Sequence, residues 1–427
     1  MTRLIIFLLF IGSNSLFAQS LIDIYKMGTI KLVPDQAYAQ GNNWEKVFLN
    51  YYDTIYNRSM GERKSIVMTP DGSVIVNHEY RNFYSRFDPS GKFIEEFGII
   101  NSSGRQLNNT KPIRGVLNNT FFTGLDNMGN MICCDFSGKY IKTLKLNYMT
   151  RDMIPLSNNK FAVVGWVVWA TKFRDFVAIV DYDTNEEKII WDYFTDWNDE
   201  RNDEHSAMFH YSYRFEKGGS ISYTTMPFLK YTGLNSPPQI AFVKNQLVIT
   251  LPVTGEILTY TIDGKLVSQE KINWAANEIS VEEQKEIQKN AIEKFENNFM
   301  VGGTRISEED VKKAKEIILQ HMREDLNRIT TPIQKPCFAS IIKDSDDNLL
   351  FFEIPEETGA NKFNVWVYNN GGNFIGQCSF ECDDYNLSIT PSKMVFHNGY
   401  IYSLQTIKET TGNPLRLVRF KLVGSNN

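Results

Sequence analysis

The chain of 427 residues carries 45 basic and 50 acidic side chains, which gives a formal net charge of −5. With 42% hydrophobic and 22% charged residues, its composition excludes a disordered, collagen-like or coiled-coil protein. No basic excess is available to neutralise phosphates, so we expect no nucleic-acid partner. Aromatic residues reach 13%, which favours β structure.

The first 18 residues have the pattern of a secretory signal. A basic start at Arg3 is followed by the apolar run Leu4–Ile11, and Leu16-Phe17-Ala18 precedes Gln19. The run is much shorter than the ~20 residues that span a bilayer. We therefore expect a signal peptide over 1–18 and an exported mature chain, 19–427, which is periplasmic or extracellular, soluble, and has no transmembrane segment. The alternative is a buried N-terminal strand.

Short strand-like runs recur along the chain, separated by turns of the Asp-Gly type. The segment Asp88–Lys92, with sequence DPSGK, is repeated as Asp135–Lys139, with sequence DFSGK, 47 residues later. Six such units can be distinguished, and four strands at a period of about 45 residues are typical of propeller blades. The sequence therefore predicts an all-β fold, a six-bladed β-propeller with a helical hairpin insertion. Seven blades remain possible, because Tyr211–Phe228 contains another hairpin-like stretch.

The sixth unit shows only three strands before the chain ends. We predict that Thr29–Val33 supplies its missing strand, which would close the ring and remove an exposed edge. The alternative is a loose N-terminal arm.

Three stretches resemble a known family. These are FDPSGKFIEEFG (Phe87–Gly98), IKLVPD (Ile30–Asp35) and TPIQKPCFASIIKDSDDNLLFFEI (Thr331–Ile354). They look like exported six-bladed β-propeller proteins of Bacteroides-type bacteria, which are NHL-like propellers. The resemblance implies the fold and the export of a single domain, 19–427, and it supplies no catalytic motif.

Two long insertions, 194–237 and 274–336, interrupt the predicted ring. Capping boxes at Ser280 and Ser307 predict two helices within 279–329. An apolar stripe on each helix suggests that the hairpin lies on the propeller as a lid or, alternatively, as a buttress or dimer surface. The stripe residues are Ile287, Ala291, Phe295 and Phe299 in the first helix and Val311, Ala314, Ile318, Met322 and Leu326 in the second.

Motifs for metal binding and catalysis are weak. His205 and His210 are five residues apart, which fits none of the usual zinc spacings. Asp344, Asp346 and Asn348 imitate half of a calcium loop, but the required Gly and Glu are missing, so a propeller turn explains them better. We expect no metal and no cofactor, and the sequence names no catalytic residue.

Five cysteines, an odd number, are present. Cys378 and Cys382 are spaced so that they could bridge around a strand end, whereas adjacent Cys133 and Cys134 would point to opposite faces of a strand. The alternative is that all are small buried hydrophobic residues.

The strands of a blade alternate in direction, so the loops between second and third strands and the connections between blades share one face. Both insertions belong to that face, where long loops on a rigid scaffold usually carry function. The candidate ligand-binding residues are Tyr80, Arg81, Trp169, Lys172 and Arg174, with ordinary loop surface as the alternative.

Two functions remain open. The first is a non-catalytic module of the cell envelope that binds or scaffolds an unknown protein or glycan. The second is a hydrolase or lyase that acts on an extracellular glycan or peptide in the propeller funnel.

Overall fold

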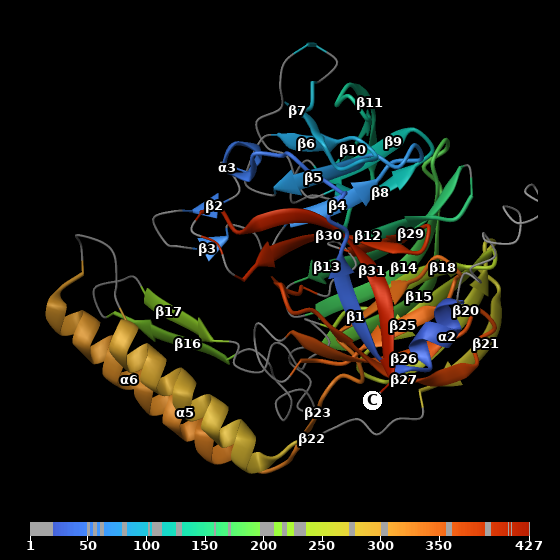
Figure 1. The fold of residues 1–427 in the computed structure, drawn as a ribbon. Helices are drawn as coiled ribbons and strands as arrows, with labels where there is room; N and C mark the ends of the chain where they lie inside the picture. Colours follow the sequence, from blue (N-terminus) through green and yellow to red (C-terminus); the bar gives the residue numbers. More distant parts are fainter. Residues whose placement is uncertain are drawn as a thin grey trace, which may run out of the picture. The chain divides into compact units, whose positions relative to one another are not determined.

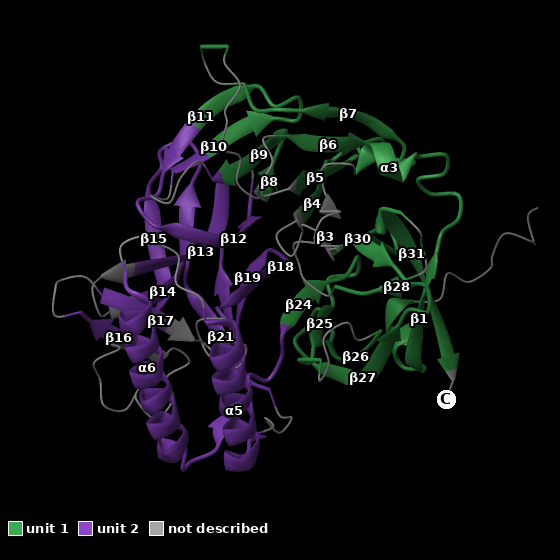
Figure 2. Cartoon of the chain, turned by 90° about the vertical axis from the view of Figure 1, so that its left-hand side faces the viewer, with its two compact units in different colours: residues 1–123, 132–142, 340–427 green, residues 124–131, 143–339 purple. Residues whose placement is uncertain are grey.

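The computed structural model, drawn in Figure 1, describes most of the chain after residue 19. It forms two compact units, coloured in Figure 2: unit 1 comprises 1–123, 132–142 and 340–427, and unit 2 comprises 124–131 and 143–339. The residues described are 20–48, 52–53, 58–59, 64–78, 83–100, 103–104, 113–124, 130–157, 159–169, 172–196, 209–215, 220–225, 236–272, 278–299, 306–355, 361–388, 394–408, 410 and 412–426. The predicted signal peptide, residues 1–18, lies outside them.

Four-stranded antiparallel sheets make up most of the described structure. The first sheet consists of β4 (Lys64–Met68), β5 (Val74–His78), β6 (Tyr84–Phe87) and β7 (Phe93–Phe97). The second consists of β8 (Ile113–Leu117), β9 (Thr120–Gly124), β10 (Asn130–Asp135) and β11 (Tyr140–Lys145). Their strand orders, β4-β5-β6-β7 and β8-β9-β10-β11, are those of simple meanders. The predicted all-β class and the predicted first two units are therefore confirmed.

A nine-stranded sheet contains two further four-stranded arrays. One consists of β24 (Ser340–Lys343), β25 (Leu349–Phe352), β26 (Lys362–Tyr368) and β27 (Phe374–Glu381). The other joins β29 (Met394–His397), β30 (Tyr400–Ile407) and β31 (Leu415–Asn426) to β1 (Gly28–Pro34), while β28 (Tyr385–Asn386) pairs with the end of β30.

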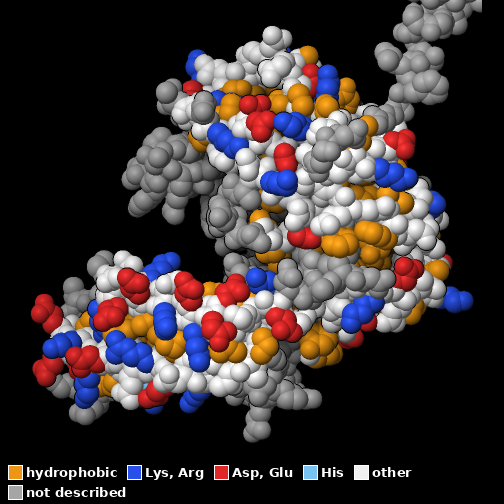
Figure 3. All heavy atoms as spheres, turned by 60° about the horizontal axis from the view of Figure 1, so that its bottom comes forward, with side chains coloured by type: hydrophobic (Ala, Val, Ile, Leu, Met, Phe, Trp, Pro, Cys, Tyr) orange, Lys and Arg blue, Asp and Glu red, His pale blue; other side chains and the backbone are white. Residues whose placement is uncertain are grey.

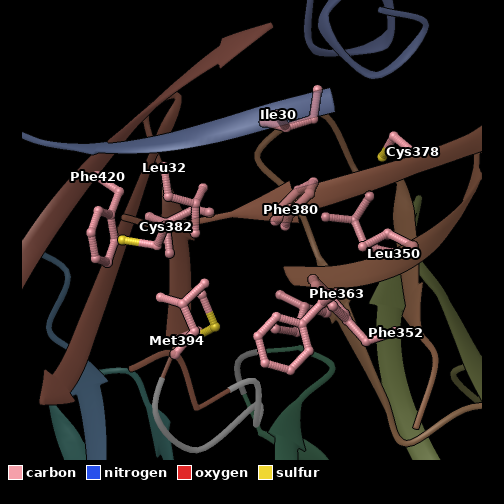
Figure 4. Close-up of a cluster of buried hydrophobic side chains, with 14 of the residues drawn as sticks. Ile30, Leu32, Leu350, Phe352, Phe363, Cys378, Phe380, Cys382, Met394 and Phe420 are labelled. Carbon is pink, nitrogen blue, oxygen red and sulfur yellow. The ribbon is translucent and has the colours of Figure 1, made fainter. Parts of the chain in front are cut away.

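The early strand β1 supplies the fourth strand of the last array, as the sequence predicts. It is antiparallel to β31 over its full length, from Gly28 opposite Asn426 to Pro34 opposite Phe420. It is also parallel to β27, with Ile30 opposite Phe380. Figure 4 shows Ile30 and Leu32 directed into the cluster that contains Phe380 and Phe420. Because β1 pairs on both sides, neither neighbouring strand keeps an exposed edge at this place.

Polar contacts fix the segment around β1 at both ends. Before it, α2 (Leu21–Tyr25) places the Tyr25 hydroxyl 2.9 Å from Asp344 Oδ2, where it donates a hydrogen bond. After it, Asp35 Oδ2 accepts hydrogen bonds from Arg419 Nε (3.1 Å) and Nη2 (2.7 Å). Further on, Asn42, which precedes α3 (Trp44–Val47), donates to Gly91 O. The segment therefore connects the two arrays of the nine-stranded sheet to each other and to sheet β4–β7.

The repeated DPSGK-type segment forms the same turn each time. Asp88 Oδ1 accepts from the backbone N–H of Ser90 (2.9 Å) and Lys92 (3.0 Å), and Asp135 Oδ1 accepts from Ser137 (2.9 Å) and Lys139 (3.0 Å). Gly138 has φ +83°, and a Cβ there would lie 2.5 Å from Gly98 O in the connection that follows β7. Glycine is required because the turn needs positive φ and touches the preceding sheet.

Asp344 accepts in the same way from the backbone of Asp346 and Asn348, both at 2.8 Å. The calcium-like residues therefore form a strand turn, as expected. Burial raises the pKa of the Asp344 carboxyl, and the hydrogen bonds from Asn348 oppose that shift.

Unit 2 holds two more four-stranded sheets. One consists of β12 (Met149–Pro155), β13 (Lys160–Trp169), β14 (Lys172–Asp181) and β15 (Glu187–Asp196). The other consists of β18 (Gln239–Val243), β19 (Gln246–Leu251), β20 (Glu256–Thr261) and β21 (Leu266–Lys271). Their facing side chains, among them Val164, Val177 and Leu247, form one buried core. The described residues thus contain six four-stranded arrays.

The two insertions pack on each other. Within the described residues, the candidate for a seventh blade forms only the two-stranded sheet β16 (Phe209–Arg214) and β17 (Ser220–Thr225). The helices α5 (Val281–Asn298) and α6 (Glu308–Arg328) bury Phe295, Ile318 and Met322 in a cluster with Tyr211 and Ile221 of this sheet. The expectation that the helical stripe lies on a propeller sheet was wrong for these residues, because β16 and β17 supply the matching aromatic face.

The helix boundaries follow the predicted capping boxes. Ser280 Oγ accepts from Glu283 N and Ser307 Oγ accepts from Asp310 N, both at 3.1 Å. The stripe of α6 is as predicted at Ala314, Ile318 and Met322. In α5 the buried side is rotated: Gln284, Gln288, Ile292 and Phe295 are buried, whereas Ile287 and Ala291 are only half-buried. In Figure 3, charged side chains of both signs cover the helical pair, with hydrophobic side chains between them.

The helical pair joins the rest of unit 2 through a short antiparallel sheet, β22 (Glu278–Ile279) with β23 (Ile333–Gln334). Gln284 Nε2 donates to Thr331 O (2.8 Å) and Ile279 O (3.1 Å) beside it. A further small sheet pairs β2 (Tyr52–Asp53) with β3 (Arg58–Ser59).

None of the five cysteines forms a disulfide, and all lie within the described residues. The suggested Cys378–Cys382 bridge was therefore wrong. Both thiols are buried in the core of unit 1, at separate places in Figure 4, and burial raises the pKa of Cys378 to about 12. Cys133 and Cys134 are also buried. These four act as small hydrophobic residues.

Candidate ligand-binding site

Three of the five predicted binding residues come together at one end of sheet β12–β15. Trp169 and Lys172 are paired in the backbone register of the β13–β14 hairpin, and Arg174 follows two residues later on β14. Cross-strand partners and alternate residues share one face of a sheet, so all three positions belong to the same face. Tyr80 and Arg81 lie outside the described residues.

Arg174 is held in place from three sides. Its Nε and Nη2 donate to Asp192 Oδ2 at 3.1 Å and 2.5 Å. The guanidinium carbon lies 5.5 Å from the ring centre of Phe176 and 4.9 Å from that of Phe194. The strand pairing explains this arrangement, because Phe194 is directly opposite Arg174 and Asp192 is opposite Phe176. The guanidinium is thus oriented before any ligand arrives.

Gly165 makes room for the inner ring of this arrangement. It pairs with Phe176, and a Cβ at this position would lie 2.5 Å from the Phe176 ring and 2.9 Å from that of Tyr148. Tyr148 meets Phe176 edge to face, with ring centres 4.7 Å apart. Sequence reasoning missed Gly165; the signal was a glycine inside an otherwise apolar strand, which marks a close approach.

One aromatic side chain beside Arg174 is exposed. Phe194 is 53% accessible on β15, the edge strand of the sheet, whereas Tyr193 (61%) pairs with Asp175 and therefore lies on the opposite face. Large apolar side chains that remain open to solvent next to an ordered charge are typical of recognition surfaces. Sequence reasoning had ended this strand at Trp191 and so missed both residues, although the sequence WDYFTD was available as a signal.

The opposite face of the same strands contains a buried ion pair. Asp175 Oδ1 lies 3.5 Å from Arg151 Nε, and the Arg151 guanidinium stands 5.3 Å from the ring centre of Trp166. Burial raises the pKa of Asp175 to about 6, although Arg151 opposes the shift. Burial likewise lowers the pKa of Arg151, while Asp175 raises it. Only 6% of Asp175 is exposed, so this carboxyl supports the strands and does not reach a ligand.

Each insertion follows the fourth strand of a four-stranded sheet. It begins at the same end of that sheet as the loop between the second and third strands. Lys172 pairs with Asp196, the last residue of β15, so the first insertion begins beside the β13–β14 hairpin. Lys271 pairs with Glu256, so the second begins beside the β19–β20 loop. This is the topology predicted from strand alternation.

The described residues contain no metal centre. Within the described residues, no group of three or more His, Cys, Asp and Glu side chains is placed to hold an ion. His205 lies outside those residues, and of His210 only the backbone, in β16, is described. Among the described helices, none is both long enough and apolar enough to cross a bilayer.

No family model and no curated protein matches the chain. Solved structures do resemble it. One is a DUF4221 family member from Bacteroides vulgatus (12% identity, 93% of this chain and 100% of that chain, TM-score 0.46). Another is a Bacteroides fragilis protein described as exported (8%, 95% and 98%, 0.47). A third is an inactive virginiamycin B lyase variant from Staphylococcus aureus (11%, 84% and 95%, 0.37). Likeness at this level decides nothing about function.

Proposed function

We propose that the chain is an exported binding module of the cell envelope, whose ligand site lies at the β13–β14 end of sheet β12–β15. The observation that carries this proposal is Arg174, whose guanidinium is held by Asp192 and by the rings of Phe176 and the exposed Phe194. Orienting these groups before binding lowers the entropy cost of association. By register, Trp169 and Lys172 occupy positions on the same face of the sheet.

We further propose that the six four-stranded arrays are the blades of one six-bladed propeller over 19–427, with 279–329 as a helical insertion. The repeated turns support it, because the turn glycine of one array touches the connection before it. The pairing of β1 with β31 supports ring closure. Export follows from the expected signal peptide over 1–18, and cleavage would leave a periplasmic or extracellular protein.

Catalysis has less support in the described residues. Asp175 is the carboxyl at this sheet whose pKa is raised, and such a shift is often found at catalytic sites. It is buried against Arg151, however, on the face opposite Arg174. A general acid must reach its substrate within hydrogen-bond distance. We therefore propose binding as the primary activity.

Site-specific photo-crosslinking tests the location of the site. The benzophenone amino acid p-benzoylphenylalanine replaces Phe194 in cells that naturally export the chain, and the same replacement at Val267 is the control. Val267 is 52% exposed on β21 of the same unit. We expect an adduct at position 194 that is lost when Arg174→Ala is added, and none at 267. Equal adducts at both positions, or none at 194, would refute the proposed site.

A further inference from the structure

The polar groups of the site also indicate a ligand class. We propose that it binds a neutral oligosaccharide, with one sugar ring against the exposed ring of Phe194 and its hydroxyl groups on Arg174 and Asp192. This inference rests on the proposed function and narrows it to one ligand class.

The first argument is the pairing of donor and acceptor. Among the described residues, Arg174 Nη1 makes no hydrogen bond, and Asp192 uses only Oδ2, so the ion pair keeps a donor group and an acceptor oxygen available for a ligand. The side chains are 22% and 39% exposed. A hydroxyl group donates and accepts at once, so two neighbouring sugar hydroxyls can satisfy both.

The second argument is charge. Arg174 and Asp192 together are neutral. An anionic ligand that approaches the guanidinium also meets the Asp192 carboxylate, and a cationic ligand that approaches the carboxylate meets the guanidinium. The pair therefore disfavours ions of either sign relative to a neutral polyhydroxyl compound. This is selection by repulsion as well as by attraction.

The third argument is the apolar surface. Phe194, on the same face of the sheet as Arg174 and Asp192, is more than half exposed. The C–H face of a pyranose ring is apolar and packs on aromatic side chains, which have few internal rotations to lose. The rings around Arg174 are ordered by Gly165, Phe176 and Tyr148 before binding.

The fourth argument is size. Besides Phe194, the described part of β15 exposes only two large apolar side chains, Tyr193 on the opposite face and Ile189 (37%). A stable protein interface covers about 800 Å² on each partner, with roughly 20–30 residues. One aromatic side chain and one ion pair match one or two sugar rings better than a protein surface.

Affinity electrophoresis in native gels tests the proposal. The gels contain a neutral polysaccharide (galactomannan, xyloglucan, yeast mannan or dextran) or, for comparison, anionic polygalacturonate or heparin. We expect at least one neutral polymer to retard the wild-type protein, and the anionic ones not to. Phe194→Ala and Asp192→Ala should each raise the dissociation constant about tenfold or more. Val267→Ala, an exposed apolar truncation on β21, should leave it unchanged.

The outcomes separate the two proposals. Near-ultraviolet circular dichroism of each variant shows whether it is folded, and only folded variants are compared. Retardation by anionic polymers alone would refute the neutral ligand. No retardation by any polymer, together with an Arg174-dependent adduct of a protein at position 194, would refute the glycan and support the binding site. Absence of both would refute both.

Discussion

The buried Asp175–Arg151 pair makes a quantitative prediction about pH and stability. Asp175 has an ordinary pKa of 3.8, and burial raises it to about 6 in the folded protein. The folded state therefore binds the proton more tightly than the unfolded state. Stability is highest below the unfolded value and falls as the pH rises through the folded value. The expected loss is about 3 kcal/mol between pH 4 and 7, since one pKa unit corresponds to about 1.36 kcal/mol.

Asp175→Asn isolates this effect, because an amide resembles the protonated carboxyl and does not titrate. Urea unfolding of wild type and variant at half-unit steps from pH 4 to 7 gives the difference in unfolding free energy. We expect the difference to shift by about 3 kcal/mol in favour of Asn as the pH rises. Other carboxyls, such as Asp35 and Asp88, occur in both proteins and cancel. A difference that stays constant with pH would show that Arg151 compensates the buried charge fully, and the account of this pair would be wrong.

Three further predictions concern the fold. Gly138→Ala should destabilise the protein by about 3 kcal/mol, because φ is +83° and the new Cβ would meet a carbonyl oxygen. Gly399→Ala should cost only about 1 kcal/mol, because φ is +76° but no atom lies within 4 Å of the new Cβ. Equal losses of stability in thermal unfolding would contradict the turn argument. Ile30→Ala, at a fully buried position of β1, should lower the free energy of unfolding by about 3 kcal/mol. Val33→Ala, at a position that is 41% exposed, should lower it by less than about 0.5 kcal/mol. Similar urea midpoints for the two variants would argue against the closing role of β1. Without reductant, the denatured protein should show five reactive thiols with Ellman's reagent, and the loss of two would indicate a disulfide.

The strands were largely predictable because their signals are local. Alternating apolar residues and turn glycines such as Gly91 and Gly138 mark each hairpin, and a positive φ at the turn depends only on neighbouring residues. The closing strand was predictable for a different reason: one array lacked a strand, and Thr29–Val33 was available to supply it. Strand β12 was missed because its sequence, MTRDMIP, places Arg151 and Asp152 inside the strand.

The site was only partly predictable, because its geometry depends on register between strands. Arg174 could be named from its loop position, but Asp192 and Phe194 become its neighbours only through the pairing of β14 with β15. The predicted buried side of α5 was wrong for a comparable reason. Gln284 is buried because its amide bonds to backbone carbonyls of the connecting segments, a contact that no helical periodicity encodes.

The location of the ligand is the central claim, and hydrogen exchange tests it most directly. Exchange is followed by mass spectrometry with and without the neutral polysaccharide that retards the protein most in native gels. We predict slower exchange in peptides that cover 165–176 and 189–196, and no change around the strand turns Asp71-Gly72 and Asp263-Gly264. Protection confined to those turns would place the ligand at the opposite ends of the sheets and contradict the account.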